Sequence, residues 1–214
     1  LGDHNFASTN GPSFGTHQEL IAGQEGHASE VPSKMPWGCD APKEDVTWVM
    51  PHGGASDHAG GGSGACGPAW VTQVVNAIGQ SQYWKSTAII VTWDEWGGWF
   101  DHMLPQQYPN SETKAYEGLG YRVPLIVISP YAKTHYVSKS RHETASALHF
   151  IEKIFGLPFV GKGSQHIYDD QRADAYDDVF QFSQKPTTFR PIPAPPNYQT
   201  CLAAQQSAPA EMDY

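Results

Sequence analysis

The chain has few cysteines, no cluster of basic residues and no long apolar run. Its three cysteines, Cys39, Cys66 and Cys201, show no CxxC or Cys-His spacing typical of a zinc site. One disulfide with one thiol left over and no disulfide at all are both open. With 13 basic against 22 acidic residues and no basic stripe, the formal net charge of −9 argues against nucleic acid or an anionic membrane as the main partner.

No apolar run approaches the ~18 residues of a membrane helix, so no membrane span is predicted. The first residues show no charged-then-apolar leader, so no signal peptide is expected in this chain, and the missing initiator Met indicates a processed or truncated N-terminus. The 21 glycines and 17 prolines predict many long loops around a modest amount of regular structure. We expect a single α/β domain over residues 1–185, followed by an extended Pro-rich tail over 186–214.

Apolar, β-branched runs predict three strands, at 46–50, 87–93 and 123–129. A helix is expected to begin at Pro68, and a second helix spans about 143–155, with Gly156 as its C-terminal cap. The order strand, helix, strand between residues 46 and 93 predicts a βαβ unit with a right-handed parallel crossover. Residues 1–12 are expected to form a loop.

The central stretch, TAIIVTWDEWGGWFDHMLP at 87–105, places two carboxylates directly after a predicted strand. Ligands bind beyond the carboxyl ends of strands in open α/β sheets, so Asp94 and Glu95 are candidates for a cation site. The Gly97-Gly98 pair lets the backbone turn and brings Asp101-His102 back towards the carboxylates. The competing interpretation is a solvated strand end, with the Trp and Phe side chains packing the loop.

Three other segments carry polar residues that suit a binding site. Thr16 and Glu19 form a capping-box pattern, so Ser13 and His17 would lie near a helix N-terminus, where an anion is favoured. Alternatively, Ser13 is a turn serine making local hydrogen bonds. The Gly-rich loop after residue 50, with His52 and His58, is either ordered by a ligand or a flexible linker. Arg141 to Thr144 would also lie at a helix N-terminus, open to an anion.

Several motifs together resemble one family. They are GPSF at 11–14, SDH at 56–58, GPAWV at 67–71, the central stretch at 87–105, RVPLIVISPYAK at 122–133 and HETASALHFIEKIFGLP at 142–158. In this order they resemble the bacterial phosphoesterase family that includes non-haemolytic phospholipases C and AcpA-like acid phosphatases, within the alkaline-phosphatase-like superfamily. The resemblance implies an α/β/α three-layer sandwich with a mostly parallel sheet.

The resemblance also implies a phosphoric ester hydrolase that works through a serine phospho-enzyme and one divalent metal ion. Ser13 matches the nucleophile, which is also a metal ligand. Asp94 and Glu95 match the paired acidic ligands, although the usual pair is Asp-Asp. His102 and His58 match histidines near the phosphate, while His17 and His52 are weaker candidates that are expected to order loops.

The chain departs from the family pattern in two places. It contains no Glu-Asn dipeptide, which in the family supplies further metal ligands, and a stretch between residues 42 and 45 is shorter than expected. The alternative is therefore an abridged, non-hydrolytic relative that binds metal or phosphate, and a different metal-based activity on the same scaffold is a third hypothesis.

The identity of the metal and of the substrate stays open at the level of the sequence. Calcium, magnesium, manganese and zinc all suit the expected ligands. The expected substrate is a small phosphate ester or a phospholipid head group. A homodimer is expected because losing the family's first strands would expose a sheet edge, and a secreted or periplasmic location follows from the resemblance alone.

Overall fold

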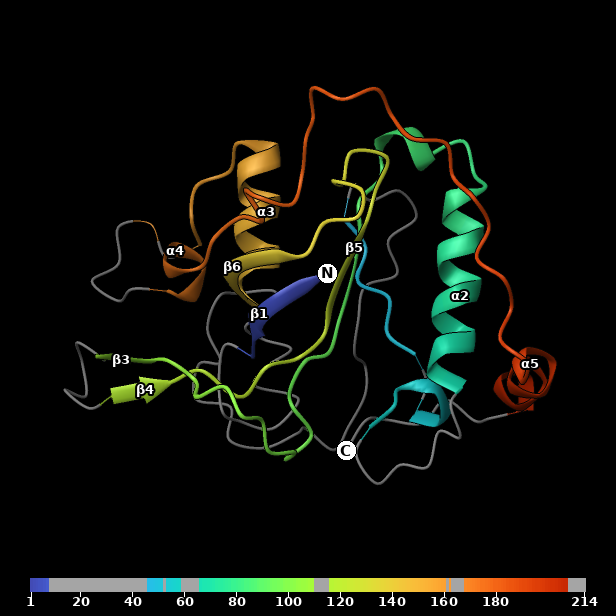
Figure 1. Cartoon of the computed structure of the whole chain (residues 1–214), viewed down its shortest axis with the longest axis horizontal. Helices are drawn as coiled ribbons and strands as arrows, with labels where there is room; N and C mark the ends of the chain where they lie inside the picture. The colour runs from blue at the N-terminus through green and yellow to red at the C-terminus, as the bar shows by residue number, and fades with distance from the viewer. Residues whose placement is uncertain are drawn as a thin grey trace. The chain divides into compact units, whose positions relative to one another are not determined.

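The computed structural model describes residues 1–7, 46–51, 53–58, 66–109, 116–160, 162 and 168–207 of the chain (Figure 1). Two compact units are present: Leu1–Cys39, Ile90–Ile128 and Ala132–Phe182 form the first, and Asp40–Ile89, Ser129–Tyr131 and Ser183–Tyr214 form the second. The elements in chain order are β1 Gly2–Phe6, η1 Gly53–Ala55, α2 Cys66–Gly79, η2 Trp84–Ser86, β2 Ile89–Thr92, β3 Gln107–Pro109, β4 Tyr116–Gly118, β5 Leu125–Ile128, β6 Ser138–Glu143, α3 Ser146–Phe155, α4 Asp169–Arg172 and α5 Tyr198–Ser207.

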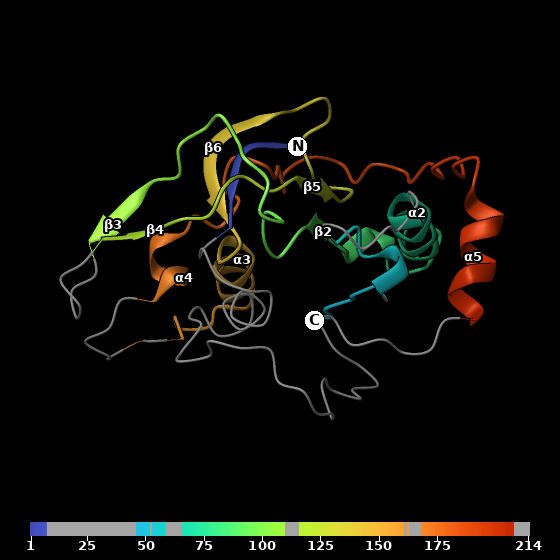
Figure 2. The ribbon, with the colours of Figure 1, turned by 90° about the horizontal axis from the view of Figure 1, so that it is seen from below.

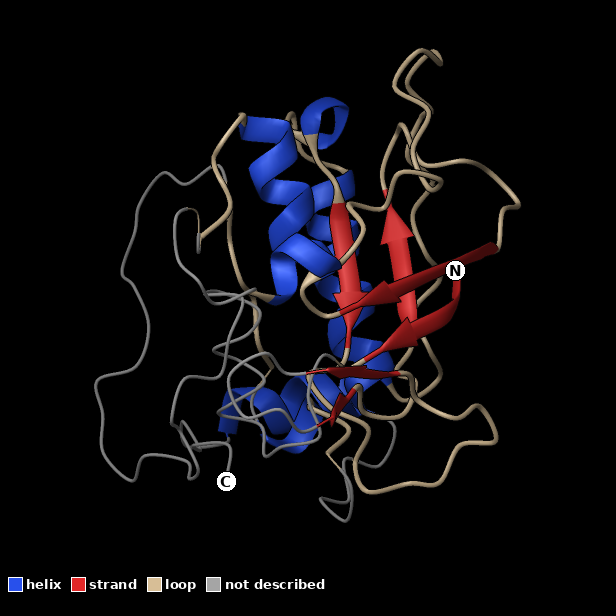
Figure 3. Ribbon diagram, turned by 90° about the vertical axis from the view of Figure 1, so that its left-hand side faces the viewer, coloured by secondary structure: helices blue, strands red, loops and turns tan. Residues whose placement is uncertain are grey.

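The described strands pair two by two within an α/β fold. β1 pairs with β6 in parallel, β2 pairs with β5, and β3 pairs with β4 in antiparallel orientation (Figure 3). Figure 2 shows the β3–β4 pair lying side by side as a short ribbon. The α/β class is confirmed, while the three-layer sandwich of the resemblance stays a prediction.

β1 is the centre of the first unit, although residues 1–12 are predicted to be a loop. On one side its register with β6 places Asn5 opposite His142 and Phe6 opposite Glu143. On the other side the Val123 amide donates to the Asn5 carbonyl at 2.9 Å. A Cβ atom at Gly2 would come within 2.8 Å of Leu125, so this strand requires a residue without a side chain there. Tertiary pairing thus makes a strand from a polar segment with no alternating pattern.

The predicted strand at 46–50 is wrong. Residues 47–50 have no regular secondary structure, and Trp48, Val49 and Met50 are 41%, 52% and 64% exposed. The β-branched composition of this segment favours a strand, but a strand needs a hydrogen-bonded neighbour, and none of the described sheets includes these residues. The predicted βαβ unit therefore does not form.

The other two predicted strands are present in shorter form as β2 and β5. Thr92 connects them to β1: its hydroxyl donates to the Pro124 carbonyl at 2.9 Å and accepts from the Asn5 side-chain amide at 3.2 Å. Pro124 precedes the first residue of β5, where its missing N–H leaves the strand pairing intact.

The two long helices agree with the sequence prediction in position, with shifted starts. α2 begins two residues before Pro68. α3 ends at Gly156, whose φ of 65° gives the left-handed cap expected of a glycine. The expected start of this helix at 143 is wrong, because Arg141, His142 and Glu143 continue β6, which pairs with β1.

In the second unit the segment after residue 183 packs along α2 and η2 before it forms a helix. Asn76 of α2 exchanges two hydrogen bonds with the Ile192 backbone, at 2.9 and 2.8 Å, and the Trp84 indole N–H donates to the Thr187 carbonyl at 2.9 Å. The Phe189 ring contacts the Trp84 ring edge-on at 5.0 Å. Residues 198–207, within the predicted extended tail, form α5.

A disulfide between Cys66 and Cys201 joins α2 to α5, which decides the pairing that the sequence leaves open. Cys39 lies outside the described residues. The bond closes a loop with a sequence separation of 135 residues. Cross-linking so long a loop restricts the unfolded chain strongly.

We expect Cys201→Ser to lower the free energy of unfolding by about 2–5 kcal/mol, because the unfolded chain regains the entropy of the open loop. The measurement is urea unfolding of oxidised parent and variant. Cys66→Ser and the double variant are matched controls and lose as much as Cys201→Ser, since one bond is removed in every case. A reduced parent as stable as the oxidised parent would contradict this expectation.

Candidate functional site

The turn after β2 carries the two predicted metal ligands of the first unit. Asp94 and Glu95 are both half-buried, and one Glu95 oxygen, Oε2, accepts a hydrogen bond from the Gly97 amide at 2.6 Å. Gly97 and Gly98 have φ angles of 66° and 72°, the left-handed region that favours glycine. The predicted Gly-Gly turn is therefore confirmed, and it holds the Glu95 carboxylate in a fixed orientation.

The far end of this loop is anchored by an ion pair. The Arg122 guanidinium donates to both Asp101 oxygens, at 2.6 and 2.9 Å, and to the Asp3 carbonyl at 2.9 Å. The hydrogen bonds from Arg122 lower the pKa of Asp101 to about 2. Asp101 is thus an anchor of the loop, while the adjacent His102 is exposed and contacts the Phe100 ring at 5.4 Å.

Part of the predicted site can be located. Asp94, Glu95 and His102 lie on one loop of the first unit. His58 is exposed in the second unit, where its amide donates to Ser56 Oγ at 3.3 Å. The predicted nucleophile Ser13, and also His17 and His52, lie outside the described residues.

The oxygen ligands of the two carboxylates after β2 suit a hard divalent cation. Carboxylate oxygens are the ligands that calcium, magnesium and manganese prefer, and the bond from Gly97 occupies one of the two Glu95 oxygens. Among the described residues, Asp94 and Glu95 are not joined by a third His, Cys, Asp or Glu ligand at metal-binding spacing. The further ligand implied by the resemblance, Ser13, is outside them.

The described residues contain one group of three side chains at metal-ligand spacing, and it is elsewhere in the first unit. His142, Asp174 and Asp178 have ligand atoms within 4.8 Å of one another. His142 Nδ1 lies 2.8 Å from Asp174 Oδ1, and Nε2 lies 2.8 Å from Ser138 Oγ and 3.6 Å from Asp178 Oδ1. Sequence reasoning missed this group, because β6 and residues 174–178 are brought together only by folding.

Hydrogen bonds from neighbouring hydroxyl groups reach one of the Asp178 oxygens. Ser138 Oγ donates to Asp178 Oδ2 at 2.6 Å, and the same oxygen accepts from the Tyr136 hydroxyl at 2.8 Å. Burial raises the pKa of Asp178, but the hydrogen bonds from Ser138 and Tyr136 lower it more, so the net shift is downward. The two carboxylates approach opposite nitrogens of the His142 ring, so one cation bound to either nitrogen would reach only one of them closely.

Serine, histidine and aspartate follow each other here in the order of a nucleophile, a base and an orienting carboxylate. However, the Ser138 and His142 side chains are completely buried, with 0% exposure, so no substrate reaches the serine oxygen. The geometry therefore supports a structural role, in which the network fixes β6 against residues 174–178.

A second buried polar pair holds α3, α4 and the loop between them. Glu152 and Asp170 are buried, and the Val160 amide donates to one oxygen of each, at 3.0 Å in both cases. Burial and the neighbouring Asp170 raise the pKa of Glu152 to about 7. Because its pKa is raised, Glu152 stays protonated up to about neutral pH, which the sequence does not reveal.

The profile of the Phosphoesterase family matches residues 40–158 of the chain. The chain is similar to phospholipase C A of Mycobacterium tuberculosis, with 27% identity over 164 residues, which cover 68% of this chain and 31% of the relative. It is 30% identical over 155 residues to the non-hemolytic phospholipase C of Pseudomonas aeruginosa, covering 56% and 22%. Non-specific phospholipase C6 of Arabidopsis thaliana is 28% identical over 149 residues, covering 61% and 28%.

The chain therefore spans less than a third of the length of these curated relatives. The matched span includes Asp94, Glu95, His58 and His102, and it leaves out Ser13. Within the described part of the chain, no helix combines the length and the apolar character that crossing a membrane requires.

We expect Ser138→Ala to lower the free energy of unfolding by about 1–3 kcal/mol, because it leaves Nε2 of the buried His142 without its hydrogen-bond partner and removes one of the bonds to Asp178. Tyr136→Phe is the matched control: it removes one bond to the same Asp178 oxygen from a half-buried position, at a cost below about 1 kcal/mol. Urea unfolding measures both losses. Equal losses of stability in the two variants would show that burial does not determine how much these hydrogen bonds contribute to the free energy of unfolding.

We expect Glu152→Gln to remove a pH dependence of stability. The folded-state pKa of Glu152, about 7, lies above its ordinary value of 4.5. The folded parent therefore binds more protons than the unfolded chain between these values, and its stability falls as the pH rises through this window, by up to about 3 kcal/mol.

Urea unfolding between pH 4.5 and pH 8 measures this dependence. The stability of Glu152→Gln relative to the parent rises across the window and stays constant above about pH 7. Asp177→Asn, at an exposed carboxylate paired with Lys153, is the control and leaves the parent profile in place. A constant difference between Glu152→Gln and the parent over the whole range would refute the raised pKa of Glu152.

Proposed function

Because the chain belongs to the phosphoesterase family, we propose that it hydrolyses phosphoric esters, as part of a metal-dependent phosphatase or phospholipase C-like enzyme. The observation that carries this proposal is the Asp94-Glu95 pair, which directly follows β2 within the span matched to the family. The relatives named as phospholipases C support a phosphate ester or a phospholipid as the substrate.

In the proposed reaction Asp94 and Glu95 hold one divalent cation, with Ser13 as a further ligand. When bound, this cation would supply Lewis-acid polarisation of a phosphate oxygen. Ser13 Oγ attacks phosphorus and its proton passes to solvent, while the bond to the leaving alkoxide breaks and His102 donates a proton to that alkoxide. Water then hydrolyses the phosphoserine, which releases the phosphate and restores the serine hydroxyl, and His102 regains its proton from solvent. His58 is proposed to donate a hydrogen bond to the phosphate.

The geometry of the loop after β2 supports this assignment. The Gly97 amide fixes Glu95 and the Asp101–Arg122 pair fixes the segment that carries His102. Positioned carboxylates reduce the reorganisation that accompanies cation binding and phosphoryl transfer. Glu95 in place of the usual Asp extends one ligand by a methylene group, which an oxygen-binding cation with flexible coordination tolerates.

An exported protein is proposed on two grounds. The Cys66–Cys201 disulfide fits an oxidising compartment, and the family resemblance implies export. The expected homodimer stays a prediction.

Asp94→Asn and Ser13→Ala separate metal binding from chemistry. We expect Ser13→Ala to retain the bound metal, because Asp94 and Glu95 still hold it. We expect the turnover of p-nitrophenyl phosphate or p-nitrophenyl phosphorylcholine to fall by about 10³-fold or more, because the nucleophile is removed. Asp94→Asn is expected to lose both the metal and the turnover. Elemental mass spectrometry and release of p-nitrophenol measure the two effects.

The exposed carboxylate variant Asp177→Asn is the control and keeps the metal and the turnover. Full turnover by Ser13→Ala would show that the nucleophile is another residue. A parent that binds about one metal ion per chain and turns over neither ester would favour the alternative, a non-hydrolytic relative that binds metal or phosphate.

A further inference from the structure

The loop that follows Glu95 exposes large apolar side chains, and residues 99–104 are called the apolar loop below. Trp99, Phe100 and Leu104 are 70%, 73% and 79% exposed, and Met103 is 36% exposed. Single exposed apolar residues are ordinary, but several on one short loop mark a contact with a partner or a membrane.

The backbone holds these side chains outward. Gly97 and Gly98, both with positive φ, turn the chain away from β2, and a Cβ atom built at Gly98 meets nothing within 4 Å. Asp101 is fixed by Arg122, and the Phe100 ring rests edge-on against Tyr121 at 5.7 Å. The apolar loop is therefore supported from within the first unit.

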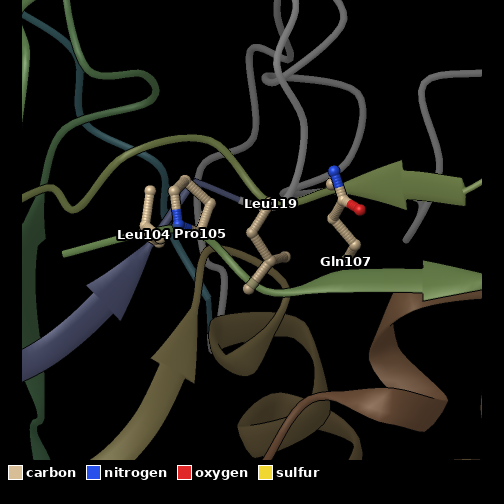
Figure 4. A pocket seen from close by; sticks show the side chains of 5 residues that line it. Leu104, Pro105, Gln107 and Leu119 are labelled. Carbon is tan, nitrogen blue, oxygen red and sulfur yellow. The ribbon is translucent and has the colours of Figure 1, made fainter.

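A pocket of about 600 Å³ adjoins the apolar loop and shares Leu104 with it (Figure 4). Leu104, Pro105 and Leu119 give it an apolar wall, and Gln107 and Gly118 complete the lining. The exposed side chains thus adjoin a recess with an apolar wall.

The charges around the loop indicate which surface it fits. Between residues 96 and 109 the sequence has no Lys or Arg, and its one acidic residue, Asp101, is neutralised by Arg122. Anionic lipids attract basic segments, so this loop gains nothing from them. Trp, Phe and Leu side chains instead gain free energy on entering the boundary between head groups and acyl chains.

We propose that the apolar loop is the contact of this chain with a zwitterionic phospholipid surface. The proposal rests on the proposed function, because the apolar loop lies on the same turn as Asp94 and Glu95 and would bring them to the head groups.

The test is flotation of the full chain with phosphatidylcholine vesicles. We expect Trp99→Ser combined with Leu104→Ser to weaken vesicle binding by about tenfold or more, because both variants remove apolar area that enters the lipid. Trp99→Phe keeps an aromatic ring and retains binding. The matched control is Tyr83→Ser, which removes a ring that is 64% exposed in the second unit and leaves binding unchanged.

Vesicle binding is measured independently of ester hydrolysis. The experiment can therefore refute the lipid contact without refuting the hydrolase function, and the reverse. Binding by a parent that hydrolyses no ester would refute the proposed function alone. Unchanged binding by the double variant, or no binding by an active parent, would overturn the lipid contact. So would a parent dimer that the double variant converts to monomer, which would make the apolar loop a contact between two copies. Turnover of p-nitrophenyl phosphorylcholine is expected to be the same in the parent and the double variant.

Discussion

The first unit depends on the backbone pairing of β1 on both sides. The Phe6 carbonyl accepts from the Thr144 amide at 3.1 Å, and the Asn5 carbonyl accepts from the Val123 amide at 2.9 Å. Asn5 also reaches Thr92 at the end of β2. Backbone groups of β1 form hydrogen bonds with β6 on one side and with the chain before β5 on the other. β1 therefore fixes the positions of these segments, which the local sequence of each segment does not specify. The Asp94-Glu95 turn inherits its position from this pairing.

The interior of the first unit is unusually polar for its size. Ser138, His142, Glu143, Ser146, Glu152 and Asp170 are all buried. Glu143 is paired with Arg172, whose guanidinium lies over the Tyr108 ring at 4.3 Å. Such groups cost free energy unless partnered, so their value lies in specifying one arrangement of β6, α3 and α4. Apolar side chains would tolerate several arrangements.

The sequence predicted elements whose signal is local and missed those whose signal is tertiary. α2 and α3 have apolar stripes at helical spacing, α3 also has a glycine cap, and β2 and β5 are apolar runs, so their existence was predictable. β6, SKSRHE, has no such pattern and is a strand because β1 pairs with it. The segment at 46–50 has a composition typical of a strand but no strand partner among the described residues, so the strand predicted from its composition alone is wrong.

In the candidate site, too, residues with a local sequence signal were predictable and residues brought together by folding were not. The family resemblance, whose family is now confirmed, predicts Asp94, Glu95 and His102 as site residues, because these residues follow one strand within a single motif. The hydrogen bonds around His142 join residues 4 and 32 positions apart in the sequence, through Ser138 and Asp174. No spacing rule relates such residues, so only the folded chain reveals them.

One loop has to satisfy two opposite requirements, and its geometry shows how. In the two proposals, Asp94 and Glu95 bind a cation at the end of β2, and the apolar loop contacts lipid. Gly97 and Gly98, with positive φ angles, lie between the two segments. A Cβ at Gly98 would find open space, yet its φ of 72° strains any other residue, so the glycine is required by backbone conformation and not by packing. The Asp101–Arg122 ion pair then closes the loop, so both its ends are fixed to the first unit.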